Sequence, residues 1–293
     1  MTARGSSGTA LVVDSGACLP PEVAGDPRVT VVPMSIEVDG RSLRDGVDIG
    51  SEELYAILRS AGPLPTSSSP SPGDYLRAFR EAGAESVLCL TIPGGFSTME
   101  RSARVAAEML REEQPGRRVE VMDTGTAAAG FTLVAEAAAA ACAAGLELEQ
   151  VVGHVARLAA STRVIAALET MRFLVRSGRV PALAGRGSDL LRVRPVFAFV
   201  GGDVRRLGLV QGTRRALRTV VDSLYEQMPR EAPLRLAAFC GDAASTMEPL
   251  VEALRGRFGV DEVERLSLTP VIALHTGPGL FGAAALCDLP LPG

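Results

Sequence analysis

The sequence has no tryptophan and no lysine, and aromatic residues make up only 4% of its 293 residues. Hydrophobic residues nevertheless reach 47%, so a core must be built mainly from Ala, Val and Leu. Arginine supplies all the strong basic charge, which indicates a coding bias and carries no functional signal. A chain of this length and apolar content suits two domains that share an interface.

Other scarcities disfavour whole classes of site and partner. Only two histidines are present, and no Cys-x-x-Cys occurs among the scattered cysteines at 18, 89, 142, 240 and 287, so we expect neither a metal site nor a disulfide framework. The net charge of −4 and the pI near 5.4 argue against nucleic acid or an anionic membrane as a partner. No loop has the glycine spacing of a nucleotide fingerprint, so we expect no cofactor.

No segment has the pattern of a targeting or membrane-spanning sequence. Residues 1–10 are small and polar, without the charged and then apolar pattern of a signal peptide, and we expect residues 1–8 to be a frayed tail. The longest apolar run, Ala127 to Gly145, is mostly alanine and contains Glu136, so it is too weakly hydrophobic to span a bilayer. We therefore expect a soluble, cytoplasmic protein with no integral membrane segment.

The first half of the chain alternates aliphatic runs with helical patterns. Apolar runs that end in Asp, Ser, Thr or Gly predict buried strands at 10–13, 86–92 and 118–122, with a further strand at 29–38 interrupted by Pro33. Amphipathic or alanine-rich patterns predict helices at 51–58, 72–82, 97–111, 127–145 and 148–160. This alternation is typical of an open parallel α/β sheet, whose ligands lie beyond the carboxyl ends of the strands.

The pattern changes near residue 160. A tight turn at Gly201-Gly202 separates two apolar runs, which predicts an antiparallel hairpin unlike anything in the first half. We predict strands at 163–168, 193–199, 205–210 and 234–240, helices at 213–227 and 244–257, a basic turn at 173–180, and a last apolar strand segment at 271–274 that ends at His275. The fold class is therefore α/β with two domains, a parallel sheet in 1–160 and a mixed sheet in 161–293.

Candidate binding residues gather first in the segment from Pro65 to Tyr75. Pro65 and Pro70 disfavour helix, so residues 65–71 should form a rigid loop that carries the hydroxyls of Thr66 and Ser67. Ser71 is a suitable N-cap for the helix that follows. A loop lined by hydroxyls at a helix N-terminus is a favourable place for an anion, although a serine-rich connector is the alternative interpretation.

Two further loops carry polar groups. Gly94, Ser97 and Thr98 follow a predicted strand and precede a helix, where Ser97 or Thr98 should be the N-cap. His275-Thr276 opens a loop shaped by Gly277, Pro278 and Gly279, for which a purely structural turn is the alternative. The other histidine, His154, is expected on the surface of its helix.

Together these segments resemble the DegV family of fatty-acid-binding proteins, along nearly the whole chain and in order. The matching segments are Asp14-Ser15, Val32-Pro33-Met34, Arg44-Asp-Gly-Val-Asp-Ile49, Pro65-Thr66-Ser67 with Pro70-Ser-Pro72, Asp123-Thr124, Gly178-Arg179, Thr213-Arg-Arg-Ala216 and His275-Thr-Gly-Pro-Gly279. The resemblance implies two domains that hold one long-chain fatty acid between them. It also implies that the protein presents the carboxylate to a fatty acid kinase for acyl phosphate formation and performs no catalysis of its own.

The resemblance implies a set of site residues as well. Ligand-binding positions would be Asp14, Ser15, Thr66, Ser67, Gly94, Ser97, Thr98, Thr124, His275 and Thr276, and the kinase would dock on Arg176, Arg179, Arg214 and Arg215. One position departs from the family pattern, because Gly94 stands where the family has a serine that binds the carboxylate; the family glutamine after Thr66-Ser67 is also replaced, by Ser68 or Ser69. Two alternatives therefore stay open: a binder of another amphipathic carboxylate on the same fold, and a serine hydrolase using Ser67 or Ser97 with His275 and Asp14 or Asp123.

Overall fold

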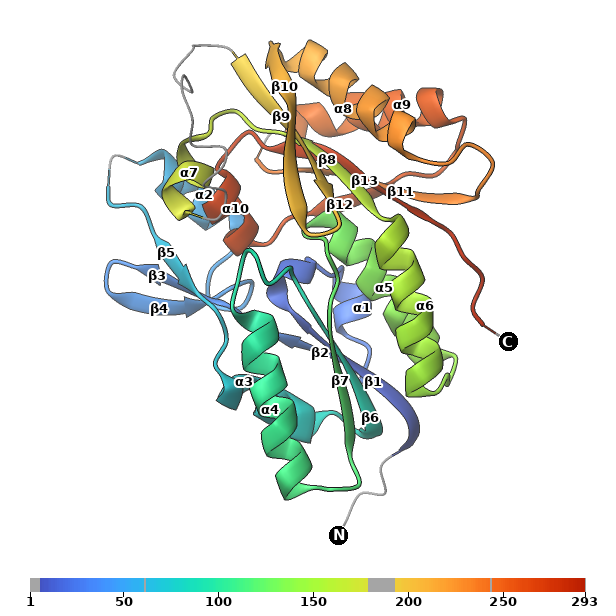
Figure 1. The fold of residues 1–293 in the computed structure, drawn as a ribbon. Helices are drawn as coiled ribbons and strands as arrows, with labels where there is room; N and C mark the ends of the chain where they lie inside the picture. The colour runs from blue at the N-terminus through green and yellow to red at the C-terminus, as the bar shows by residue number, and fades with distance from the viewer. Residues whose placement is uncertain (1–5, 61, 179–192, 243, 293) are drawn as a thin grey trace.

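Two β-sheets stacked with helical layers make up most of the molecule (Figure 1). The computed structural model describes residues 6–60, 62–178, 193–242 and 244–292. The first sheet has four strands in the order β2-β1-β6-β7, all parallel, as the alternation of strands and helices predicted. Its strands are β1 (Ser6–Asp14), β2 (Val29–Val32), β6 (Ala84–Thr91) and β7 (Arg118–Asp123).

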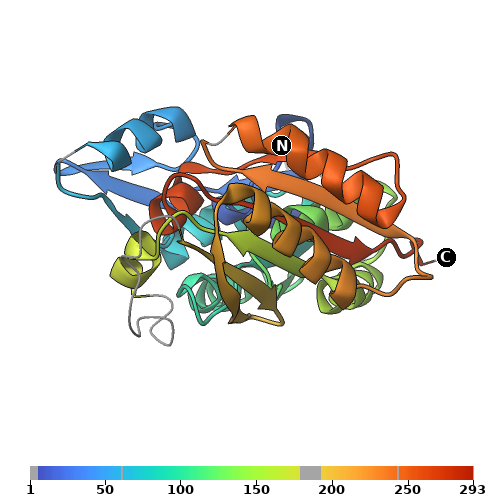
Figure 2. The ribbon, with the colours of Figure 1, turned by 90° about the horizontal axis from the view of Figure 1, so that it is seen from above.

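The second sheet has six strands in the order β10-β9-β8-β13-β11-β12. Only β11 and β12 are parallel and the other pairs are antiparallel, so the predicted mixed sheet is confirmed. Helices α8 (Thr213–Gln227) and α9 (Ala244–Phe258) cover its outer face (Figure 2). The strands are β8 (Arg163–Ala167), β9 (Val193–Val200), β10 (Asp203–Gln211), β11 (Leu234–Cys240), β12 (Glu264–Ser267) and β13 (Phe281–Cys287).

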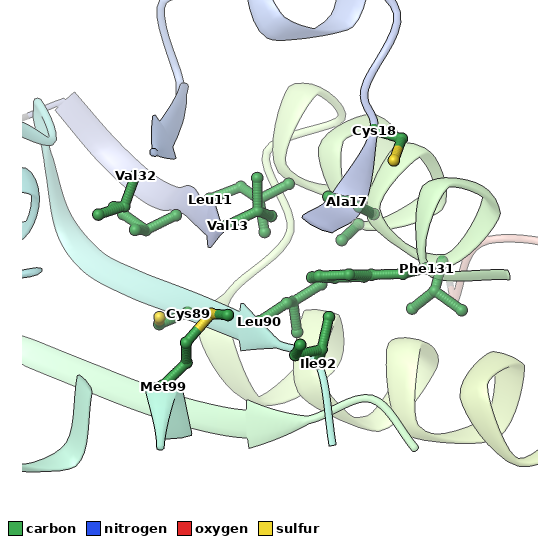
Figure 3. Close-up of a cluster of buried hydrophobic side chains, with 14 of the residues drawn as sticks. Leu11, Val13, Ala17, Cys18, Val32, Cys89, Leu90, Ile92, Met99 and Phe131 are labelled. Carbon is green, nitrogen blue, oxygen red and sulfur yellow. The ribbon is translucent and has the colours of Figure 1, made fainter. Parts of the chain in front are cut away.

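Helices α5 (Ala129–Ala143) and α6 (Leu148–Ser161) pack against strands of both sheets. A helix in that position must be apolar on more than one side, which explains why α5 is mostly alanine without a clear polar face. Figure 3 shows Phe131 of α5 lying against Leu90 and Ile92 at the carboxyl end of the parallel sheet. Helices α3 (Pro72–Glu81) and α4 (Met99–Glu113) cover the other face of that sheet.

A small antiparallel sheet lies beside the two large ones, in the order β4-β3-β5. It consists of β3 (Ser35–Val38), β4 (Arg41–Arg44) and β5 (Thr66–Ser68). Helix α10 (Pro270–Thr276) packs against β5 and also contacts α2 (Ser51–Arg59) and α7 (Arg172–Ser177), which come from distant parts of the chain. Two short helices, η1 (Ser15–Ala17) and α1 (Pro21–Ala24), follow β1.

Four local predictions were wrong. Residues 6–8 belong to β1 and not to a tail, because Ser6 is paired with Ala84 at the start of β6. The expected strand at 29–38 is split at Pro33 into two strands of different sheets, and the expected loop at 65–71 contains β5. The segment at 271–274 lies in helix α10, so His275 is in the last turn of a helix and not at a strand end.

The boundary near residue 160 stays a prediction. Every strand from β8 onward joins the six-stranded sheet, yet the core around α5 and α6 contains buried residues from both halves. Within the described part of the chain, no helix is long and apolar enough to cross a membrane.

Candidate functional site

An apolar cavity of about 170 Å³ lies between the two large sheets and the small one. Both halves of the chain line it, and most of its wall is aliphatic or aromatic. The lining residues are Met34, Ser67, Ser69, Ile92, Phe96, Ser97, Met99, Ala127, Ala128, Val164, Ala166, Leu168, Leu174, Phe197, Phe199, Val204, Phe239, Val271, Ile272, His275, Thr276 and Leu280. Such a cavity suits a long apolar group that enters from one polar end.

Hydroxyl groups and one imidazole form the polar part of the wall. Ser67 Oγ and His275 Nε2 are 2.9 Å apart, and Ser69 Oγ and Ser97 Oγ are also 2.9 Å apart. The two pairs come from three elements, β5 with its continuation, α10, and the loop after β6. Hydroxyls and imidazole can donate to a carboxylate without placing a fixed charge in the cavity.

The alternation of a β-strand decides which residues of the Thr-Ser segment face the cavity. Ser67 and Ser69 are half-buried and line it, whereas Thr66 and Ser68 are exposed on the opposite side of β5. The structure therefore does not bring Thr66 together with Ser97 and His275, although the resemblance implied that all three are ligand-binding residues. Ser69 is the residue that the sequence reasoning missed as a site residue; the signal that could have found it is the spacing of two from Ser67.

The loop between β6 and α4 forms the neighbouring rim. Ser97 Oγ accepts a hydrogen bond from the Met99 amide at 3.2 Å, and Thr98 is the N-cap residue of α4 but makes no capping hydrogen bond with its side chain. Thr98 and Gly94 line a second, open cavity of about 390 Å³, which adjoins the first through Ser67, Ser69, Phe96 and Ser97. The polar groups of the apolar cavity thus border an open, polar space.

Gly94 is oriented toward carboxylates of the protein. Its amide donates to Asp123 Oδ2 at 2.9 Å, and a Cβ atom on Gly94 would lie 3.2 Å from Glu100 Oε2 and 3.9 Å from Asp123 Oδ2. A serine at position 94, as in the family pattern, would therefore have its Cβ atom next to two acidic side chains.

Four other predicted ligand residues are bonded to the protein backbone. Asp14 Oδ1 and Oδ2 accept from the amides of Gly16 and Ile92 at 2.9 and 3.1 Å, and burial raises the pKa of Asp14 to about 7. Ser15 Oγ accepts from the Met34 amide at 3.1 Å, and Thr124 Oγ1 donates to the Thr91 carbonyl at 2.9 Å. Asp14, Ser15 and Thr124 are buried and do not line the cavity. Thr276 does line it, while its hydroxyl donates to the Ile272 carbonyl at 2.7 Å.

The arginines predicted to dock a partner differ in their exposure and in their contacts. Arg176, in the last turn of α7, donates to the Leu64 carbonyl at 3.1 Å and so supports the segment that leads into β5. Arg214 and Arg215 are exposed in the first turn of α8. Arg179 lies outside the described residues.

His154 and the acidic residues that the structure describes give no sign of a metal site. His154 is buried in α6, so the expectation of a surface residue was wrong, and burial lowers its pKa. The helix is covered on two sides by sheets, which leaves that position no access to solvent. Among the described residues, no group of three or more His, Cys, Asp or Glu side chains is arranged to hold a metal ion.

Comparisons with known proteins agree with this architecture. The family model described as "Uncharacterised protein, DegV family" matches residues 8–288. This chain belongs to the DegV family. A DegV domain-containing protein of Deinococcus radiodurans is 28% identical over 277 residues, which cover 94% of this chain and 97% of that protein.

Two solved structures superpose on nearly the whole chain. One, described as fatty acid binding of a DegV family protein from Thermus thermophilus, is 32% identical with a TM-score of 0.84 and covers 96% of this chain and 100% of its own. The other, a stearic acid-binding protein from Eubacterium ventriosum, is 25% identical with a TM-score of 0.87 and covers 95% of this chain and 98% of its own. The two-domain DegV fold expected from the resemblance is therefore confirmed.

Proposed function

We propose that this protein binds one long-chain fatty acid, with the tail in the apolar cavity and the carboxylate at Ser67, Ser69, Ser97 and His275. The observation that carries the proposal is the cavity itself, which is apolar along its walls and has hydroxyl and imidazole pairs at one end. The two similar structures whose descriptions name fatty acid or stearic acid support the choice of ligand.

The tail and the head group have different roles in binding. Burying a tail of about 14 methylenes at ~0.8 kcal/mol each contributes on the order of 11 kcal/mol before the costs of association. Each hydrogen bond to the charged head contributes only about 1.5–3 kcal/mol. Tail burial therefore sets most of the affinity, while the hydroxyl and imidazole groups set the position of the carboxylate.

The test begins with the protein as purified from a heterologous host. Denaturing extraction and mass spectrometry should find about one fatty acid per chain, and added palmitate should stabilise lipid-free protein against heat. Ala166→Leu, which adds volume to the cavity wall, should lower the amount of carried lipid. Ala160→Leu, on an exposed position of α6, is the matched control. Repeated extractions without an acyl chain, together with no stabilisation by palmitate, would rule out the proposal.

In the finer form of the proposal, the protein presents the bound carboxylate to a fatty acid kinase and does no chemistry unaided. The open polar cavity next to Ser97 supports this form, since a phosphoryl donor could reach the carboxylate from that side. Exposed Arg214 and Arg215 are the proposed contacts with the kinase. Reversing both to Glu should weaken kinase-dependent phosphorylation at least tenfold and leave palmitate binding intact, whereas Arg111→Glu in the last turn of α4 should change neither. Equal loss of both functions in the double variant would contradict the docking role.

A serine hydrolase is the second candidate, because Ser67 and His275 are within hydrogen-bond distance. The acids that would complete a triad are already used, since Asp14 accepts from Gly16 and Ile92 and Asp123 accepts from Gly94 and Gly125. Turnover of fatty acyl esters that is lost in Ser67→Ala would favour the hydrolase over the binding protein.

A further inference from the structure

Asp45 is a buried acidic residue that no part of the proposed binding site uses. It follows β4 in the segment Arg44-Asp-Gly-Val-Asp-Ile49, and its side chain is only 2% exposed. Its amide donates to the Met34 carbonyl at 2.8 Å, which ties the residue to the start of β3. Removing a carboxyl group from water is unfavourable, so a buried one normally has a structural or functional partner.

That partner is the first turn of α10, 226 residues further along the chain. Asp45 Oδ1 accepts a hydrogen bond from the Val271 amide at 2.8 Å. Thr269 is the N-cap residue of α10, but its hydroxyl donates to the Ser15 carbonyl at 3.2 Å and makes no capping bond to the helix. Asp45 therefore satisfies a free amide of the first turn in place of the local N-cap residue.

The opposite end of α10 carries His275, four residues after Val271, whose ring is bonded to Ser67 on β5. Of the two residues that hold its ends, Ser67 belongs to the small sheet and Asp45 directly follows strand β4 of that sheet. In it, Ile36 of β3 is paired with Ser67 of β5, and Ser35 of β3 is paired with Arg44, which directly precedes Asp45. Helix α10 is thus attached to the β4-β3-β5 sheet at both ends.

A helix this short depends on such attachments. Seven residues rise about 10 Å in total, and isolated helices of that length are not stable in water. Its orientation must therefore come from the contacts of its ends and of its buried face, where Val271, Ala273 and Leu274 pack in the core. Loss of the Asp45 bond would remove the attachment at the start of α10 and leave its orientation to the remaining contacts.

We propose that Asp45 is a positioning residue: it caps α10 on the small sheet and thereby holds the His275 imidazole at the Ser67 hydroxyl. The role of the His275–Ser67 pair rests on the proposed function, in which this pair orients the fatty acid carboxylate. Asp45 does not touch the cavity, and it acts on the head group only through α10.

The chain has only two histidines, so nuclear magnetic resonance of histidine-labelled protein can follow the His275 ring directly. His154, buried in α6, is the internal reference, and His154→Gln assigns the signals. In lipid-free protein, Asp45→Ala should move the His275 ring ¹⁵N signals toward those of Ser67→Ala and should speed exchange of the Val271 amide at least tenfold. Asp45→Asn, whose amide oxygen can still accept from the Val271 amide, should largely restore the wild-type His275 signals and the slow exchange of the Val271 amide.

The matched control is Asp48→Ala, three residues along the same turn, where the exposed carboxylate pairs with Arg44. It should leave the His275 signals and the Val271 amide unchanged. Should Asp45→Ala not fold, Asp45→Asn and Asp45→Glu give the comparison, since only the former keeps the acceptor at the same distance. A folded Asp45→Ala or Asp45→Glu protein with wild-type His275 signals and Val271 exchange would overturn the proposal.

A second arm uses palmitate labelled with ¹³C at the carboxyl carbon. Asp45→Ala should shift the bound carboxyl resonance while the affinity for palmitate changes less than tenfold. An unchanged carboxyl resonance in a variant with displaced His275 signals would overturn the link to the head group. If the wild-type protein binds no palmitate, the proposed function fails, whereas the lipid-free arm still decides whether Asp45 positions His275.

Discussion

Four consecutive hydroxyl residues, Thr66 to Ser69, differ in the structure mainly by the side of the strand on which they lie. Ser67 and Ser69 face the cavity, and Thr66 and Ser68 face solvent. The sequence singled out this segment but could not say which of its hydroxyls face the cavity, because an expected loop has no defined alternation. Pairing with β3 supplies the alternation, and that pairing depends on a strand 30 residues earlier.

Alanine substitution along this segment gives the first prediction. Ser67→Ala and Ser69→Ala should each weaken palmitate binding by about 1–2 kcal/mol, roughly 5- to 30-fold, since each removes one hydrogen-bonding group from the head-group end. Thr66→Ala and Ser68→Ala should change the affinity less than twofold. Isothermal titration calorimetry on lipid-free protein makes the comparison, and equal losses at all four positions would contradict the assignment of faces.

Gly94 gives a second prediction at this scale. Gly94→Ser should be tolerated, because the nearest atom to the new Cβ, 3.2 Å away, is the end of the flexible Glu100 side chain. It should not raise the affinity for palmitate, since the added hydroxyl lies near Glu100 and Asp123 and can donate to either. Calorimetry of the variant is the measurement, and a gain above about fivefold would show that the hydroxyl reaches the ligand.

At the scale of elements, the long periodic patterns gave the most accurate helix limits. Helix α8 has the predicted limits, and α3 begins after Ser71 with the expected cap, in which Ser71 and Asp74 bond to each other's backbone amides. Helix α10 was missed because four apolar residues fit a buried strand as well as a helical turn. Strands β12 and β13 were missed because neither pattern indicates a strand until neighbours pair with it: three of the four residues of β12 are polar, and three of the seven residues of β13 are alanine.

The end of α10 provides the third prediction. Gly277 has φ +77°, and a Cβ atom there would lie 2.1 Å from the Phe173 ring, so Gly277→Ala combines backbone strain with a steric clash. Gly212 is the matched control, because its φ is +80° and nothing lies within 4 Å of an added Cβ. Gly212→Ala should cost about 1 kcal/mol of stability and Gly277→Ala at least about 3 kcal/mol, measured by urea unfolding. Equal costs would show that Phe173 moves away freely.

For the whole molecule, the sequence predicted a parallel sheet and a mixed sheet but not how they stack. The change of pattern near residue 160 is visible in the sequence, because a hairpin replaces the alternation of strands and helices. The placement of α5 and α6 between the sheets is not visible, because an alanine-rich helix can pack on one side or on two. That stacking also buries Glu136 of α5 against Arg235 of β11, at a boundary between the two sheets.

The last prediction concerns the pH dependence of stability. Burial raises the pKa of Asp14 to about 7, of Asp45 to about 6 and of Glu136 to about 7, the last with a contribution from the nearby Glu264. A carboxyl group whose pKa is higher in the folded than in the unfolded state binds more protons when folded. Its stabilising contribution is full below its unfolded pKa near 4 and is lost as the pH rises toward its folded pKa.

The free energy of unfolding of lipid-free protein should therefore fall between pH 5 and pH 7.5, by at least about 1.4 kcal/mol, the value of one pKa unit. Buried His154, whose pKa is lowered, acts in the opposite direction and makes the fall smaller. Glu136→Gln removes one of the three groups and should flatten the fall, because the amide keeps a hydrogen bond to Arg235 without titrating. Glu149→Gln, at an exposed partner of Arg118, should leave the slope unchanged. Urea unfolding across this range measures the slopes, and a stability that rises with pH equally in all three proteins would show that these carboxyl groups are not buried in the folded protein.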